Sequence, residues 1–116
     1  MRDQLFLLPP GFVDNARREY CPECAEIWGL LHYFPAIKES LDIVYEPIGH
    51  PRPALTAALG EGEWNCPTLV LAAIAPGIDP EAAGIQERRG RFYIDNARDI
   101  GRYFMLQYGT PAPRGS

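Results

Sequence analysis

Lysine and long apolar runs are the two features that this sequence most clearly lacks. Lys38 is the only lysine, and the 15 acidic residues outnumber the 11 basic ones, which gives a formal net charge of −4. Binding to the phosphate backbone of a nucleic acid depends on clustered Lys and Arg, so we expect no nucleic-acid partner. No apolar run approaches the roughly 18 residues that a membrane-spanning helix needs, so we expect no membrane partner either.

Cysteine is scarce as well, and its number is odd. The three cysteines are Cys21, Cys24 and Cys66. Only four consecutive apolar residues precede Pro9, which is too few for the apolar segment of a secretory signal. We therefore expect a cytoplasmic location, where redox or metal chemistry explains the cysteines better than a disulfide framework does.

The length and composition are those of one globular domain. The chain has 116 residues, of which 47% are apolar, and this is enough to bury one core. We expect a single domain over residues 1–114. The final Gly115-Ser116 follows a proline-rich stretch, and we interpret it as a cloning remnant outside that domain.

Short apolar patterns separated by proline and glycine predict an α/β fold. The continuous apolar run Leu5–Leu8 is typical of a strand buried on both faces. A helix should begin at Cys21-Pro22 and end near Phe34, because Pro35 disfavours helical geometry in the residue before it. Further strands are expected at 42–48, 68–72 and 91–94, and further helices at 53–59 and from Asp95 or Asn96 to Gly109.

This order of elements is β-α-β-α-β-β-α. The β-α-β start requires a parallel pair of strands, and the last two strands can pair as an antiparallel hairpin. The sequence thus predicts one mixed four-stranded sheet covered by helices. We expect a polar loop at 10–20 and an irregular connection at 74–89.

One tetrapeptide occurs twice. Asp14-Asn15-Ala16-Arg17 is repeated as Asp95-Asn96-Ala97-Arg98. Because Asp-Asn is a common capping and turn pair, we interpret the repeat as a coincidence in which the first copy starts a short turn before Tyr20.

The residues with the clearest chemical meaning are Cys21-Pro22-Glu23-Cys24. They follow a predicted strand and begin a predicted helix, where free backbone N–H groups and the helix dipole favour a thiolate. Cys21 would then be a nucleophile near neutral pH, and Cys24, one helical turn later, could resolve a mixed disulfide formed on Cys21.

Two other interpretations of the cysteines stay open. Cys21 and Cys24 could be small apolar core residues or half of a zinc site. Cys66 could be a third redox cysteine, a buried core residue, or a thiolate that joins Cys21 and Cys24 in binding zinc or an iron–sulfur cluster.

Two segments point to a known family. They are Cys-Pro-Glu-Cys at Cys21–Cys24, after the first strand, and Asn65-Cys66-Pro67-Thr68-Leu69, before the third. In these segments the chain resembles the thioredoxin-like superfamily, with the closest likeness to glutaredoxins and glutathione transferase N-terminal domains. The strand, turn and helix from Gly90 to Phe104 look like the end of those domains. The chain also looks similar to an uncharacterised bacterial thioredoxin-like family of unknown function.

The resemblance implies a fold, a site and a cofactor. It implies a thioredoxin-like fold in which Pro67 is cis and faces the active cysteines. It further implies that Asp95 and Asn96 hold the γ-glutamyl end of glutathione, while the backbone beside Pro67 pairs with its cysteinyl part.

The function expected from these residues is a glutaredoxin-like thiol–disulfide oxidoreductase that acts on a thiol or disulfide peptide or protein. One alternative is a metal or iron–sulfur protein that uses the three cysteines. The other is a non-catalytic interaction module that kept the fold.

Overall fold

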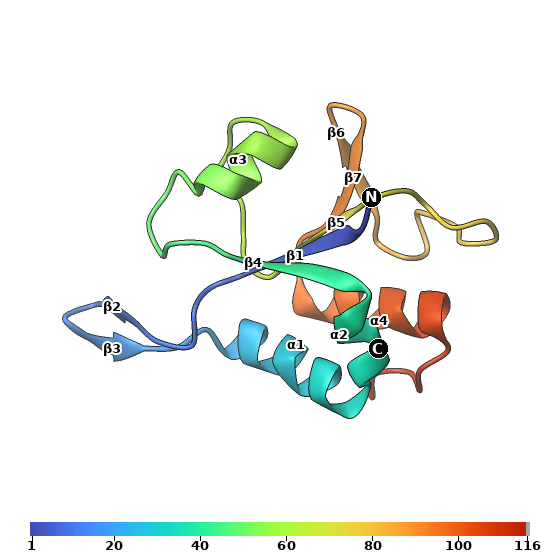
Figure 1. Ribbon diagram of the computed structural model, residues 1–116, viewed down its shortest axis with the longest axis horizontal. Helices are drawn as coiled ribbons and strands as arrows, with labels where there is room; N and C mark the ends of the chain where they lie inside the picture. Colours follow the sequence, from blue (N-terminus) through green and yellow to red (C-terminus); the bar gives the residue numbers. More distant parts are fainter. Residues whose placement is uncertain (116) are drawn as a thin grey trace.

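The computed structural model describes residues 1–115, and a mixed five-stranded sheet lies at its centre (Figure 1). The strands are β1 (Asp3–Leu7), β4 (Leu41–Tyr45), β5 (Thr68–Leu71), β6 (Gln86–Arg88) and β7 (Arg91–Ile94), in the spatial order β4-β1-β5-β7-β6. β1 and β4 are parallel, whereas every other neighbouring pair is antiparallel. The predicted α/β class, the parallel first pair and the pairing of β5 with β7 are thus confirmed.

The prediction of four strands was wrong, because β6 adds a fifth at the edge of the sheet. β6 comes from the connection at 74–89 and returns to β7 through Arg89-Gly90, whose φ angles of 52° and 75° form a tight left-handed turn. All three residues of β6 are exposed, so no alternation of apolar residues marks it in the sequence.

A separate hairpin replaces the predicted loop at 10–20. It consists of β2 (Phe12–Asp14) and β3 (Arg17–Glu19), which pair antiparallel and project away from the rest of the molecule (Figure 1). Asn15 and Ala16 make the turn, with φ angles of 52° and 57°. The first copy of the repeated tetrapeptide is therefore a turn, as expected, and the turn joins two strands.

Among residues 1–115 there are four helices, α1 (Pro22–Tyr33), α2 (Pro35–Glu39), α3 (Pro53–Leu59) and α4 (Ala97–Tyr108). α1 begins after Cys21 and ends before Pro35 as predicted, and α2 is an additional short helix. Asn96 caps α4, and Gly109 ends it with a φ of 74°, also as predicted. α1, α2 and α4 lie on one side of the sheet and α3 lies on the other (Figure 1).

The core lies where the central strands meet these helices. β5 is buried at all four positions because it is an interior strand covered on both faces. The fully buried apolar side chains include Leu5, Leu7, Ile27, Leu31, Leu55, Leu69, Leu71, Ile94, Ile100 and Phe104.

None of the helices in residues 1–115 has the length and apolarity needed to span a bilayer. Of the Gly115-Ser116 pair interpreted as a cloning remnant, Ser116 lies outside the described residues.

Candidate functional site

Cys21 occupies the N-cap of α1. Its backbone is extended, with φ −83° and ψ 112°, and its Sγ accepts a hydrogen bond from the backbone N–H of Cys24 at 3.2 Å. Pro22 fills the first helical position, where its missing N–H costs no hydrogen bond. The side chain is half-buried. These contacts place the sulfur where a helix N-terminus stabilises negative charge.

Cys24 is the buried member of the pair, with an exposed fraction of 3%. Its Sγ accepts the backbone N–H of Leu8, at the end of β1, at 3.5 Å. The pKa of the Cys24 thiol is raised to about 12, mainly by burial and secondarily by the hydrogen bond with Cys21. Cys24 is therefore a neutral thiol at physiological pH.

Cys66 approaches Cys21 through its backbone. The Cys66 carbonyl oxygen lies 3.8 Å from Cys21 Sγ, and the Cys66–Pro67 peptide bond is cis, as the resemblance implies. The Cys66 thiol itself is buried, and burial raises its pKa to about 11, an effect that the nearby Arg52 guanidinium partly offsets. All three cysteines are free thiols.

Two buried charges beside Cys66 were not predicted. Arg52 donates to the carbonyl oxygens of Pro47, Ile48 and Trp64 at 3.0–3.1 Å. Glu46 follows β4, and its carboxylate accepts backbone N–H groups from the first turn of α3. Both side chains are less than 10% exposed. No sequence pattern distinguishes these charges from the exposed ones, since their burial depends on where α3 lies.

Asp95 and Asn96, the residues expected to hold glutathione, both have structural contacts. Asn96 Oδ1 accepts the Asp99 N–H at 2.9 Å, and its amide donates to the Asp99 carboxylate at 3.0 Å. Asp95 Oδ1 accepts from Gln86, while the Asp95 carbonyl oxygen accepts from Asn65 at 2.8 Å. Because Asn65 precedes Cys66, this last bond connects Asp95 to the cysteine region.

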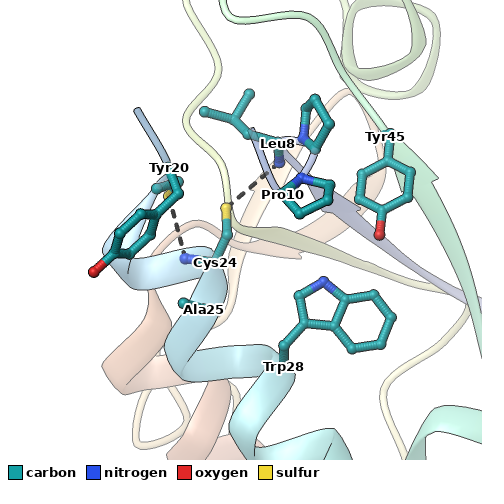
Figure 2. Close-up of a pocket in the computed structure, with 9 residues that line it drawn as sticks. Leu8, Pro10, Tyr20, Cys24, Ala25, Trp28 and Tyr45 are labelled. Atoms are coloured by element: carbon teal, nitrogen blue, oxygen red, sulfur yellow. Dashed lines mark hydrogen bonds between the residues drawn. The ribbon is translucent and has the colours of Figure 1, made fainter. Parts of the chain in front are cut away.

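Cys21 lines two hollows of different chemistry. The first, of about 280 Å³, reaches Cys66 and is bordered by the charged side chains of Asp14, Glu19, Glu23 and Arg52. The second, of about 380 Å³, includes Cys24 and has no charged side chain in its lining. Figure 2 shows the second hollow, with Trp28, Tyr45 and Pro10 around it.

The expected metal ligands do not form a recognised cluster. Within residues 1–115 no group of three or more His, Cys, Asp or Glu side chains has an arrangement that could hold a metal ion. Binding of zinc or an iron–sulfur cluster by Cys21, Cys24 and Cys66 stays a prediction.

Comparison with known proteins gives one family. A family model described as "Protein of unknown function (DUF3088)" matches residues 2–112. The chain belongs to this family. The DUF3088 match extends from β1 to beyond α4 and includes all three cysteines. No curated protein and no solved structure gives a significant match to the chain.

Proposed function

We propose that this chain is a thiol–disulfide oxidoreductase in which Cys21 is the nucleophile and Cys24 the resolving thiol. The observation that carries the proposal is the contrast between the two sulfurs. Cys21 is half-buried at the N-terminus of a 12-residue helix and accepts a backbone N–H, whereas Cys24 is buried and its pKa is raised. A dithiol exchange reaction needs one accessible thiol that attacks the substrate and a second thiol that resolves the mixed disulfide.

The reaction follows from these positions. The Cys21 thiolate attacks one sulfur of a substrate disulfide, a bond forms between the two sulfurs, and the second substrate sulfur leaves as a thiolate. Cys24 then loses its proton and attacks Cys21 Sγ, which releases the first substrate thiolate and leaves a Cys21–Cys24 disulfide. Two electrons pass from the protein to the substrate, and an external thiol reductant restores the dithiol.

The order of the main elements supports this assignment. They follow the β-α-β-α-β-β-α order predicted from the sequence, in β1, α1, β4, α3, β5, β7 and α4. The peptide bond before Pro67 is cis, and the carbonyl oxygen before it faces Cys21 Sγ. In the proposed site this segment pairs with the backbone of the bound thiol peptide.

Glutathione is the reductant that the resemblance favours. Asn96 uses its side chain to cap α4, so within the proposed pair Asp95 is the better partner for the γ-glutamyl end. A cytoplasmic location, which also stays a prediction, would supply that reductant. Turnover measured separately with glutathione and with dithiothreitol as the electron donor tests this preference.

The test is turnover of bis(2-hydroxyethyl) disulfide by the parent chain and three variants. Cys21→Ser should abolish turnover, because the two remaining thiols, Cys24 and Cys66, are buried. Cys24→Ser, incubated with the disulfide in the absence of reductant, should still make the first attack and accumulate a mixed disulfide on Cys21, visible by mass spectrometry of the intact chain. Cys66→Ala is the matched control and should keep both steps.

A folded Cys24→Ser variant that accumulates no mixed disulfide would contradict the proposed nucleophile. Absence of exchange by the folded parent chain would favour the interaction module instead. Bound metal in stoichiometric amount after anaerobic purification, with all three thiols shielded, would favour the metal-binding alternative.

A further inference from the structure

The uncharged hollow beside Cys21 and Cys24 has two distinct walls. One wall is a stripe along α1, and the other comes from the end of β1 and from β4 (Figure 2). The α1 stripe consists of Cys21, Cys24, Ala25 and Trp28, and the facing residues are Leu8, Pro9, Pro10, Tyr45 and, at the start of α1, Tyr20. Cys21 and Cys24 therefore both border the hollow, Cys21 half-buried and Cys24 buried with 3% exposure.

The rim of this hollow exposes two aromatic rings to solvent. Tyr20 is 63% exposed and Tyr45 is 49% exposed. Aromatic rings supply a large apolar contact area at a small entropic cost, and they stack well on other flat or apolar groups. The volume of about 380 Å³ lies within the range of small-molecule sites.

Charge separates this hollow from the one on the Cys66 side. The Cys66 side has three carboxylates and Arg52 around it, whereas none of the nine lining residues here is an Asp, Glu, Lys, Arg or His. An ionic group would lose its hydration in the uncharged hollow without gaining a partner. An uncharged aromatic or branched aliphatic group loses nothing of this kind, and its burial is favourable.

We propose that this hollow is the binding site for an uncharged aromatic or bulky apolar group attached to the sulfur that Cys21 attacks. The inference rests on the proposed oxidoreductase function and specifies its substrate class. Cys21 attacks the sulfur that carries the apolar group, and the other sulfur leaves as a thiolate. Cys24, in the wall of the same hollow, then displaces the apolar thiolate from Cys21.

The experiment compares two disulfides that share one half, benzyl 2-hydroxyethyl disulfide and bis(2-hydroxyethyl) disulfide. Rate constants for modification of Cys21 are measured in the Cys24→Ser variant and divided by those for N-acetylcysteine, which removes intrinsic reactivity. We expect the benzyl compound to react about tenfold faster after this correction, which corresponds to about 1.4 kcal/mol. The adduct mass should show the benzylthio group on Cys21.

Tyr45→Ala removes part of one wall and should lower the ratio of the two corrected rates several-fold. Tyr33→Ala is the matched control, because Tyr33 is a 75% exposed aromatic residue of α1 that does not line the hollow. It should leave the ratio unchanged. A parent ratio near one, a predominantly hydroxyethylthio adduct, or an equal effect of Tyr33→Ala would overturn the inference.

Binding without chemistry separates this inference from the proposed function. Benzyl methyl sulfide is a thioether and cannot exchange with a thiol. In the parent chain it should shift the indole N–H resonance of Trp28, which lines the hollow, and leave that of Trp64 in place. A shift without disulfide exchange would overturn only the oxidoreductase function, whereas exchange without a shift at millimolar sulfide would overturn only the apolar site.

Discussion

At the scale of single residues, Cys21 and Cys24 show how position decides the chemistry of a thiol. They are three positions apart on one helix, and each sulfur accepts one backbone N–H. Cys21 lies at the helix end and is half-buried, while Cys24 faces the core with 3% exposure. Burial favours the neutral form of a thiol, so the two residues are suited to different steps of the proposed reaction.

The raised pKa of Cys24 predicts a loss of stability at alkaline pH. The thiol ionises near its ordinary value of 9.0 when unfolded, but only at about 12 when folded. The contribution of the neutral Cys24 thiol to the free energy of unfolding is therefore fully present below about pH 9. Above that pH it is lost by about 1.4 kcal/mol per pH unit. Urea unfolding of the reduced chain between about pH 8 and pH 10.5 measures this slope.

Cys24→Ala should have a shallower slope than the parent by about that amount, because it lacks the thiol whose ionisation is linked to unfolding. Cys66→Ala should behave similarly, since burial raises the pKa of Cys66 to about 11. Parallel slopes for all three chains would contradict the burial of both thiols.

At the scale of elements, one tetrapeptide adopts two structures. Asp14-Asn15-Ala16-Arg17 turns between β2 and β3 with positive φ at its centre. Asp95-Asn96-Ala97-Arg98 starts α4, where Asn96 caps the helix with an extended backbone. Asn suits both roles, because its side chain caps helices and it tolerates the left-handed region. Ala suits only the second.

The same substitution should therefore have opposite effects in the two copies. Ala16→Gly removes the cost of a left-handed alanine and creates an Asn-Gly turn, so we expect the hairpin to gain about 1 kcal/mol. Ala97→Gly places glycine in the first turn of a helix at a buried position and should cost about 1 kcal/mol of the free energy of unfolding.

Hydrogen exchange of the β2 and β3 amides measures the first effect, and urea unfolding measures the second. Slower exchange of the hairpin amides in Ala16→Gly is the expected result. Faster exchange there, or a stabilised Ala97→Gly chain, would mean that the two copies do not differ in backbone geometry as described.

At the scale of the whole molecule, two buried charges join parts that are distant in sequence. Glu46 holds the start of α3 beside the end of β4. Arg52 links the chain before α3 to Trp64, two residues before Cys66. Cys66 in turn presents its carbonyl oxygen to Cys21. The geometry of the cysteine site thus depends on hydrogen bonds of Arg52 and Glu46, which precede Cys66 by 14 and 20 residues in the sequence.

Loss of the Arg52 side-chain charge should destabilise the fold strongly. Arg52→Met leaves the carbonyl oxygens of Pro47, Ile48 and Trp64 without these donors, and we expect a loss of at least about 2 kcal/mol. Urea unfolding at neutral pH measures it. Arg18→Met, at an exposed arginine, is the control and should change stability by less than about 0.5 kcal/mol. Equal effects of the two substitutions would contradict a structural role for Arg52.

Most regular elements could be predicted from local sequence. Pro22 and Pro35 place both ends of α1, and Asn96 and Gly109 place both ends of α4, because caps and prolines act within a few residues. β6 and the β2–β3 hairpin could not be predicted in this way. Their residues are mostly exposed, so their strand geometry comes from pairing and from left-handed turns rather than from an apolar pattern.

The sequence by itself determined that Cys21 lies at the start of a helix with Cys24 one turn later, because helix capping and helical spacing are local properties. Only the tertiary structure decided that Cys24 is buried, that the Cys66 carbonyl meets Cys21, and that an uncharged hollow lies beside both Cys21 and Cys24. These features depend on β1, β4 and the Cys66–Pro67 segment converging on α1, and no local pattern encodes that convergence.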